Sequence, residues 1–87
     1  MNFTKMNNIL KYGANFPNLH RAVIFHYDPL TGVVDVRSMY SEDRGEVYMW
    51  LEEKMKLYTQ LGIDCRGYVD QQLFFECGDV TKYFKEG

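Results

Sequence analysis

Residues 43–61 form the pattern that most constrains the fold, because they predict a long amphipathic helix in a chain of only 87 residues. Asp43 and Glu46 have the spacing of a capping box, and Leu61-Gly62-Ile63 has the residue order of a Schellman helix end. A chain of this length supports one hydrophobic core. The helix is therefore expected to pack centrally on the sheet that the rest of the chain forms.

Apolar residues occupy about half of the circumference of this helix when they are projected at about 100° per residue. They are Val47, Tyr48, Trp50, Leu51, Met55, Leu57, Tyr58 and Leu61. Packing on one sheet face requires a stripe of roughly 100°. We therefore expect part of this apolar arc to contact a second partner.

The segments Arg21–Tyr27 and Val33–Met39 are rich in β-branched and aromatic residues, which favours two strands. The loop between them begins with Asp28 and Pro29 and ends with Gly32, which is typical of a hairpin built on a type I turn. The resulting register gives one apolar face and one mixed face. The apolar face holds Val23, Phe25, Tyr27, Val34 and Val36, and the mixed face holds Ala22, Ile24, His26, Asp35, Arg37 and Met39.

A second hairpin is predicted around a three-residue loop of Asp70, Gln71 and Gln72. Its register pairs apolar residues on one face and sets an aromatic pair beside an ion pair on the other face. The first face pairs Val69 with Leu73, Gly67 with Phe75 and Cys65 with Cys77. The second face pairs Tyr68 with Phe74 and Arg66 with Glu76.

The remaining segments predict two short helices. Residues 3–12 have helical spacing and are followed by Gly13 as a cap, and residues 14–20 form a connector. After Gly78 and Asp79, which offer a cap, Val80, Tyr83 and Phe84 recur at the spacing of a short last helix. The chain is thus predicted to be a single small two-layer α+β domain over residues 1–87, in the order α-β-β-α-β-β-α. A four-stranded, mainly antiparallel sheet is packed by the long central helix, with helices mostly on one face. The pattern leaves open whether the two hairpins join within the molecule or pair across a dimer.

Composition and charge exclude several classes of protein. A net charge of −2 argues against a surface built entirely for phosphate, although a local basic patch stays open. The chain has no leader-like start and no apolar run long enough for a membrane helix, so a cytoplasmic location is expected. The two cysteines, Cys65 and Cys77, are expected to be free thiols in the core. No cluster of residues predicts a metal site or a cofactor.

One pair of residues could suggest a catalytic role. His26 opposite Asp35 has the form of a general base oriented by a carboxylate, but no nucleophile or second acid accompanies the pair. The other histidine, His20, is expected in a surface loop. We therefore expect no enzyme activity, and an ordinary cross-strand pairing of His26 with Asp35.

Several apolar residues, most of them aromatic, are not needed for the predicted core. Core positions are Val23, Phe25, Val36, Leu51, Tyr58, Val69, Leu73 and Phe75, and the surplus is Tyr48, Leu57, Tyr68, Phe74 and Tyr40. Coverage of Tyr68 and Phe74 by a terminal helix is the alternative to their exposure. Tyrosine together with arginine is the composition of interface hot spots. The candidate partner-binding residues are Tyr68, Phe74, Arg66, Glu76, Arg37, His26 and Tyr48.

These features favour a small non-enzymatic protein–protein interaction module that occludes another macromolecule or associates with itself as a homodimer. In character the chain resembles the small inhibitors that phages and mobile elements encode against host nucleases and CRISPR complexes, although no motif carries this resemblance. The alternative is a nucleic-acid or nucleotide-binding module that uses an Arg/Tyr sheet face, with Arg21, Arg37 and Arg66 beside tyrosines.

Overall fold

The computed structural model describes residues 1–12 and 16–85, and within them the predicted α+β class and element order are confirmed. The elements are α1 (Phe3–Tyr12), β1 (His20–Asp28), β2 (Val33–Ser41), α2 (Arg44–Gln60), β3 (Cys65–Val69), β4 (Gln72–Cys77) and the 3-10 turn η1 (Val80–Tyr83). The last element is thus a 3-10 turn rather than the predicted α-helix. Gly13, the predicted cap of the first helix, lies outside the described residues.

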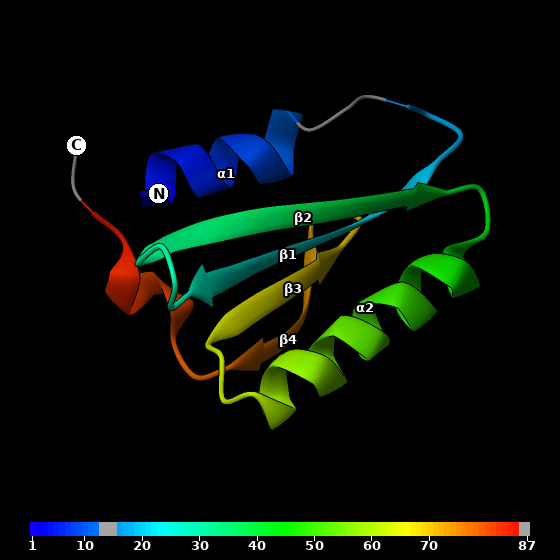
Figure 1. The fold of residues 1–87 in the computed structure, drawn as a ribbon. Helices are drawn as coiled ribbons and strands as arrows, with labels where there is room; N and C mark the ends of the chain where they lie inside the picture. Colours follow the sequence, from blue (N-terminus) through cyan, green and yellow to red (C-terminus); the bar gives the residue numbers. More distant parts are fainter. Residues whose placement is uncertain (13–15, 86–87) are drawn as a thin grey trace.

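The two hairpins join into one continuous antiparallel sheet with the strand order β2-β1-β3-β4 (Figure 1). β1 and β3 pair antiparallel, with Ala22 opposite Val69 and Ile24 opposite Gly67. The alternative in which the hairpins pair only across a dimer is therefore wrong. β1 becomes the central strand, and all residues from Arg21 to His26 are buried.

Helices cover both faces of this sheet, which corrects the prediction that they lie mostly on one face. α2 packs on the face that carries Ala22, Ile24 and Val69. α1 and η1 pack on the opposite face, against Val23 and Phe25 (Figure 1). The physical reason is that β1 carries apolar side chains on both faces, so each face must be shielded from water.

The first hairpin has the predicted register. His26 lies opposite Asp35 and Ile24 lies opposite Arg37. Asp28 fixes the loop, because its carbonyl oxygen accepts from the Gly32 N–H at 2.8 Å and its carboxylate accepts from the Leu30 N–H at 2.9 Å. The strands extend one or two residues beyond the predicted bounds.

The second hairpin differs from the prediction near its turn. Cys65–Cys77, Arg66–Glu76 and Gly67–Phe75 pair as predicted, but Tyr68 lies opposite Leu73 and Val69 lies opposite Gln72. The predicted pairs Tyr68–Phe74 and Val69–Leu73 are therefore wrong. Two features cause the change: a two-residue turn, in which Asp70 and Gln71 have φ values of 48° and 70°, and a bulge that leaves Phe74 as the extra residue of β4.

Both ends of α2 have identifiable caps. At its C-terminus the Ile63 N–H donates to the Tyr58 carbonyl at 2.9 Å and Gly62 has a φ of 68°, which confirms the Schellman closure. At its N-terminus Asp43 accepts from the Gly45 N–H, rather than from the N–H of Glu46 as a capping box requires. The Glu46 carboxylate instead accepts from the Ser41 hydroxyl, whose oxygen accepts from the Asp43 N–H.

The core lies in two clusters, one on each face of the sheet. Leu51 is central to the α2 side and Phe25 to the α1 side, both with no exposed surface. Two predicted core residues are wrong: Leu73 is 54% exposed and Val36 is 38% exposed. Both stand on edge strands, where only one neighbouring strand shields them.

The two ends of the described chain meet on the α1 face. The Lys85 N–H donates to the Met1 carbonyl oxygen at 2.9 Å, and the rings of Phe3 and Phe84 pack edge to face at 5.0 Å. The first and last segments thus cover the sheet together.

Candidate interaction surface

Three side chains from α2 and β4 form an aromatic and cationic cluster, which we call the Arg44–Phe74 surface (Arg44, Tyr48 and Phe74). Arg44 and Phe74 are exposed, and Tyr48 is half-buried. The ring of Phe74 packs edge to face on that of Tyr48 at 5.1 Å. The Arg44 guanidinium lies over the Tyr48 ring at 5.4 Å and donates to its hydroxyl at 3.2 Å. Arg44 and Tyr48 can meet because they are four residues apart on one helix.

The β-bulge creates this surface. As the extra residue of β4, Phe74 contacts Tyr48 on the α2 side and also lies 6.2 Å from the ring of its neighbour Phe75. Phe74 remains 38% exposed, and the Arg44 side chain is 53% exposed. Aromatic and arginine side chains are therefore presented together at one end of α2.

Asp70, in the β3–β4 turn, lies beside Arg44 at the edge of this surface. Its carboxylate accepts from His20 Nδ1 at 2.7 Å and from the Arg21 N–H at 2.9 Å, and lies 3.9 Å from the Arg44 Nε. Partial burial acts to raise the pKa of Asp70, but these hydrogen bonds and the Arg44 charge outweigh it and lower the pKa. Asp70 is thus held as an anion beside the cationic part of the surface.

Tyr68 lies on the opposite face of the sheet from the Arg44–Phe74 surface. Its ring packs edge to face on Phe25 at 5.9 Å within the α1-side cluster. The sequence left open whether a terminal helix covers Tyr68. In the structure, Tyr68 packs in the cluster that α1 and η1 cover. Phe74, by contrast, stays exposed.

Arg66 and Glu76 form the predicted ion pair, at 2.9 Å between Arg66 Nη2 and Glu76 Oε1. Burial acts to lower the pKa of Arg66, but hydrogen bonds with Glu76 and Tyr68 hold it above its ordinary value. The Arg66 side chain is only 18% exposed. Arg66 therefore pairs within the protein and is not part of the Arg44–Phe74 surface.

The remaining two candidates, Arg37 and His26, are on the first hairpin. Arg37 is exposed on β2, whereas His26 is buried under α2, with its ring stacked on Tyr58 at 4.7 Å. Burial lowers the pKa of His26 more than the charge of the neighbouring Asp35 raises it. His26 Nε2 has no hydrogen-bond partner among the described residues.

The buried His26 predicts a loss of stability in mild acid. Its unfolded-state pKa is near 6.5 and its folded-state pKa is lower, so the unfolded chain takes up the proton more readily. The contribution of His26 to the free energy of unfolding is therefore fully present above pH 6.5. It is lost as the pH drops from 6.5 to the folded-state pKa. Urea unfolding between about pH 7 and about pH 5 should show this slope in the native protein and lose it in His26→Gln. His20→Gln is the matched control and should keep the slope; an unchanged slope in His26→Gln contradicts the assignment.

The two cysteines occupy opposed positions on β3 and β4 and are free thiols, as predicted. Burial raises the pKa of the Cys65 thiol to about 12, with a further contribution from Cys77. A thiol with such a pKa is a poor nucleophile near neutral pH. Within residues 1–12 and 16–85, no group of three or more His, Cys, Asp or Glu side chains is arranged to hold a metal ion.

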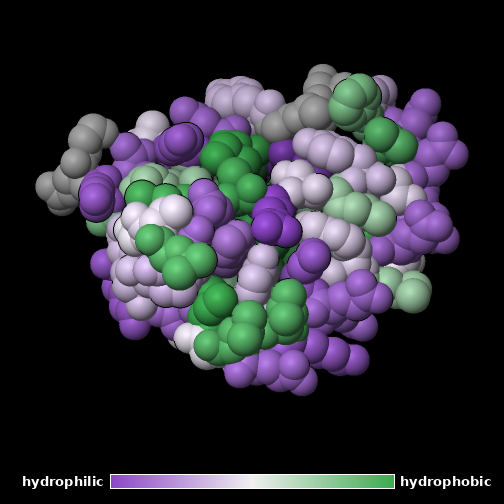
Figure 2. Space-filling model, viewed as in Figure 1, coloured by the Kyte–Doolittle hydropathy of each residue, from purple (hydrophilic) through white to green (hydrophobic). Residues whose placement is uncertain are grey.

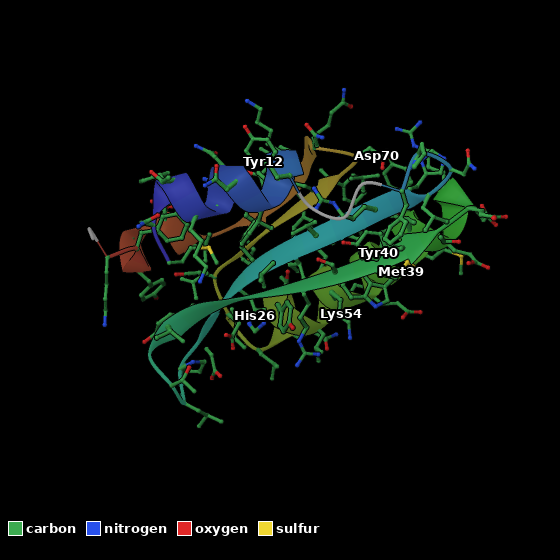
Figure 3. All side chains as sticks on the ribbon, turned by 90° about the horizontal axis from the view of Figure 1, so that it is seen from above. Tyr12, His26, Met39, Tyr40, Lys54 and Asp70 are labelled. Carbon is green, nitrogen blue, oxygen red and sulfur yellow. The ribbon has the colours of Figure 1, made fainter. Side chains whose placement is uncertain are left out.

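A groove lies between α1 and β2. It is an open groove of about 620 Å³, with Tyr12 on α1 and Tyr40 on β2 among its lining residues. Figure 3 shows these two tyrosines on their separate elements. The guanidinium of Arg21 at the groove donates to the carbonyls of Ile9 and Leu10 at 2.9 and 2.6 Å, so it holds the end of α1. Phe16 packs edge to face on Tyr40 at 5.9 Å.

Sequence reasoning found Tyr48 and Phe74 but missed Arg44, Asp70 and His20. Arg44 had a signal, because it precedes Tyr48 by four residues on a predicted helix. Asp70 and His20 had none, because they are separated by fifty positions and meet only through the pairing of β1 with β3.

Fold and surface together define a small α+β protein that presents an aromatic and arginine cluster at one end of its main helix. No family model matches the chain, and no curated protein or solved structure matches it either. Among the helices of the described segments, none has the length and apolar character needed to cross a membrane.

Proposed function

We propose that this protein is a non-enzymatic protein-binding module that occludes a surface of its partner through the Arg44–Phe74 surface. The observation that carries the proposal is one contact cluster in which Phe74 and Arg44 are exposed and the half-buried ring of Tyr48 joins them. Aromatic and arginine side chains dominate interface hot spots, because they combine a large apolar area with fixed polar groups.

The charges around the surface indicate the chemistry of the partner. The Arg44 guanidinium lies over the Tyr48 ring, and its Nε is 3.9 Å from the Asp70 carboxylate. The Arg44 side chain is nevertheless exposed to solvent. An apolar side chain of the partner would rest on Phe74, with an acidic group facing Arg44. Asp70 would oppose a second acidic group and thereby restrict the orientation of the complex.

The biological role we assign is inhibition, as in the small phage or mobile-element proteins that block host defence complexes. Three features support this role: the small size of the domain, polar groups such as Arg21 and Arg66 that are paired within the protein, and the Arg44–Phe74 surface. Occlusion requires only a surface that binds a partner, and no reacting groups.

Nucleic-acid binding is the second candidate, because a cation beside exposed rings is also a stacking site for single-stranded bases. Binding of nucleic acid on the sheet face itself is disfavoured, because Arg21 and Arg66 form hydrogen bonds within the protein. Tyr68 on that face packs against Phe25. Salt separates the two candidates: affinity for nucleic acid falls steeply as salt increases, whereas a largely apolar protein contact persists.

The test combines capture with affinity measurement. A photoreactive phenylalanine analogue placed at Phe74 should cross-link the partner, and Phe74→Ala should weaken its binding by about tenfold or more. Met49→Ala is the matched control, because Met49 is adjacent to Tyr48 on α2 but 64% exposed and outside the cluster. Equal affinity of Phe74→Ala and native protein, with an unchanged circular dichroism spectrum, removes this surface from the proposal.

A further inference from the structure

β2 is an edge strand whose outer side has no strand partner within the described residues. It spans nine residues and pairs with β1 over its whole length without a register shift. Proteins usually protect such edges with proline, charged side chains (lysine above all), bulges or short strands. The other edge, β4, has six residues and a bulge, whereas β2 contains no proline or lysine.

The hydrogen bonds of β1 show which backbone groups of β2 point outward. The Tyr27 N–H donates to the Asp64 carbonyl and the Asp70 N–H donates to the Arg21 carbonyl, both at 3.0 Å. Odd-numbered residues of β1 therefore direct their backbone groups toward β3. Because this direction alternates along a strand, the even-numbered residues of β1 direct theirs toward β2.

Asp35 and Arg37 lie opposite His26 and Ile24. Their backbone N–H and C=O groups therefore form hydrogen bonds with β1. The intervening residues of β2 direct their N–H and C=O groups to the outside. These are Val34, Val36 and Ser38.

The side chains of this stretch have a self-complementary order. Asp35 and Arg37 are exposed on either side of Val36, which is itself 38% exposed. Figure 2 shows polar side chains over β2, between apolar areas toward α1 and toward α2. When the strand is reversed about Val36, each Asp35 takes the place opposite an Arg37.

We propose that a second copy of this chain binds the β2 edge, with the two β2 strands antiparallel and Val36 of each copy opposite the other on a two-fold axis. The outward groups of residues 34–38 then form about six backbone hydrogen bonds, since each bonded pair exchanges two. The Asp35 and Arg37 side chains of the two copies form two ion pairs on the α2 side. The inference goes beyond the proposed function, because this edge does not include Phe74.

Charge selects this register over its neighbours. Pairing centred on Asp35 sets two carboxylates opposite each other, and pairing centred on Arg37 sets two guanidinium groups opposite each other. Like charges directly opposed across strands are destabilising. The register centred on Val36 is the one among these three that pairs unlike charges.

The test uses two single charge reversals. The native protein should sediment as a concentration-dependent dimer, and Asp35→Arg or Arg37→Asp should each weaken dimerisation by on the order of a hundredfold, because each creates two like-charge pairs. Mixing these two variants should restore a dimer containing one copy of each, since Arg at position 35 then faces Asp at position 37. Glu52→Arg, an equal charge change on the exposed side of α2, should leave the native dimer unchanged.

A backbone variant tests the edge independently of charge. Val36→Pro removes an outward N–H that no strand of the same chain uses, so the domain should keep its fold while the dimer dissociates. A native protein that is monomeric up to millimolar concentration overturns the proposal. A dimer that survives Val36→Pro, or variants that do not associate on mixing, also overturns it. Phe74→Ala should leave the dimer intact, so failure of the proposed function and failure of this inference are distinguishable.

Discussion

Replacement of Phe25 by alanine is expected to lower the free energy of unfolding by about 3–5 kcal/mol. The ring has no exposed surface and packs against Tyr68 between the central strand and α1, so its removal leaves a cavity that the sheet cannot close. A domain of this size has a total stability of roughly 4–13 kcal/mol, so the variant should lose a large part of it. Urea denaturation followed by Trp50 fluorescence measures the change.

Leu73→Ala is the matched control for Phe25→Ala. Leu73 was also expected in the core but is 54% exposed on an edge strand, so its loss should cost less than about 1 kcal/mol. Comparable losses for the two variants would mean that β4 is more deeply packed than the exposure of Leu73 indicates.

Arg21→Met is expected to lower the free energy of unfolding by about 2–3 kcal/mol and to loosen α1 selectively. The substitution keeps an apolar stem but removes the donors to the carbonyls of Ile9 and Leu10, and with them the positive charge at the C-terminus of α1. Hydrogen exchange should accelerate in α1 more than in α2.

Lys11→Met is the control for this variant. Lys11 is in the same last turn of α1 but is exposed, so its replacement should change stability by less than about 0.5 kcal/mol. Unchanged exchange of the α1 amides in Arg21→Met would show that packing alone, without the guanidinium, holds this helix on the sheet.

The first hairpin and α2 were predictable because their signals are local. The chemistry of the loop from Asp28 to Gly32 determines its length, and the loop length sets the register of the strands. Gly62 with Ile63 likewise determines where α2 ends. Each of these signals acts within a few residues of its effect.

The second hairpin was only partly predictable, because its turn places two residues other than glycine at positive φ. Nothing in the residue types of Asp70 and Gln71 distinguishes a two-residue turn from the three-residue loop. The bulge at Phe74 compensates for the shorter turn, so the pairs from Gly67 outward keep the predicted register. Tyr48 and Phe74 were singled out as surplus aromatics, but their contact depends on this bulge.

Long-range pairing accounts for the remaining misses. The His20–Asp70 contact and the shielding of both sheet faces require β1 to pair with β3, and no local pattern specifies which strands of two hairpins become neighbours. The wide apolar arc of α2 indicated a second partner for the helix, and part of that arc remains exposed at Leu57 and Leu61.

The meeting of the chain ends on the α1 face has a consequence for the order in which the protein matures during synthesis. α1 is translated before the sheet, but the backbone bond between Met1 and Lys85 and the packing of Phe3 on Phe84 form only after residues 84 and 85 have been translated. The sheet face that carries Phe25 therefore stays incompletely covered until Phe84 has been translated. A circular permutant that joins the two ends and opens the loop at Leu30, which is 95% exposed, would make these contacts local and should fold faster.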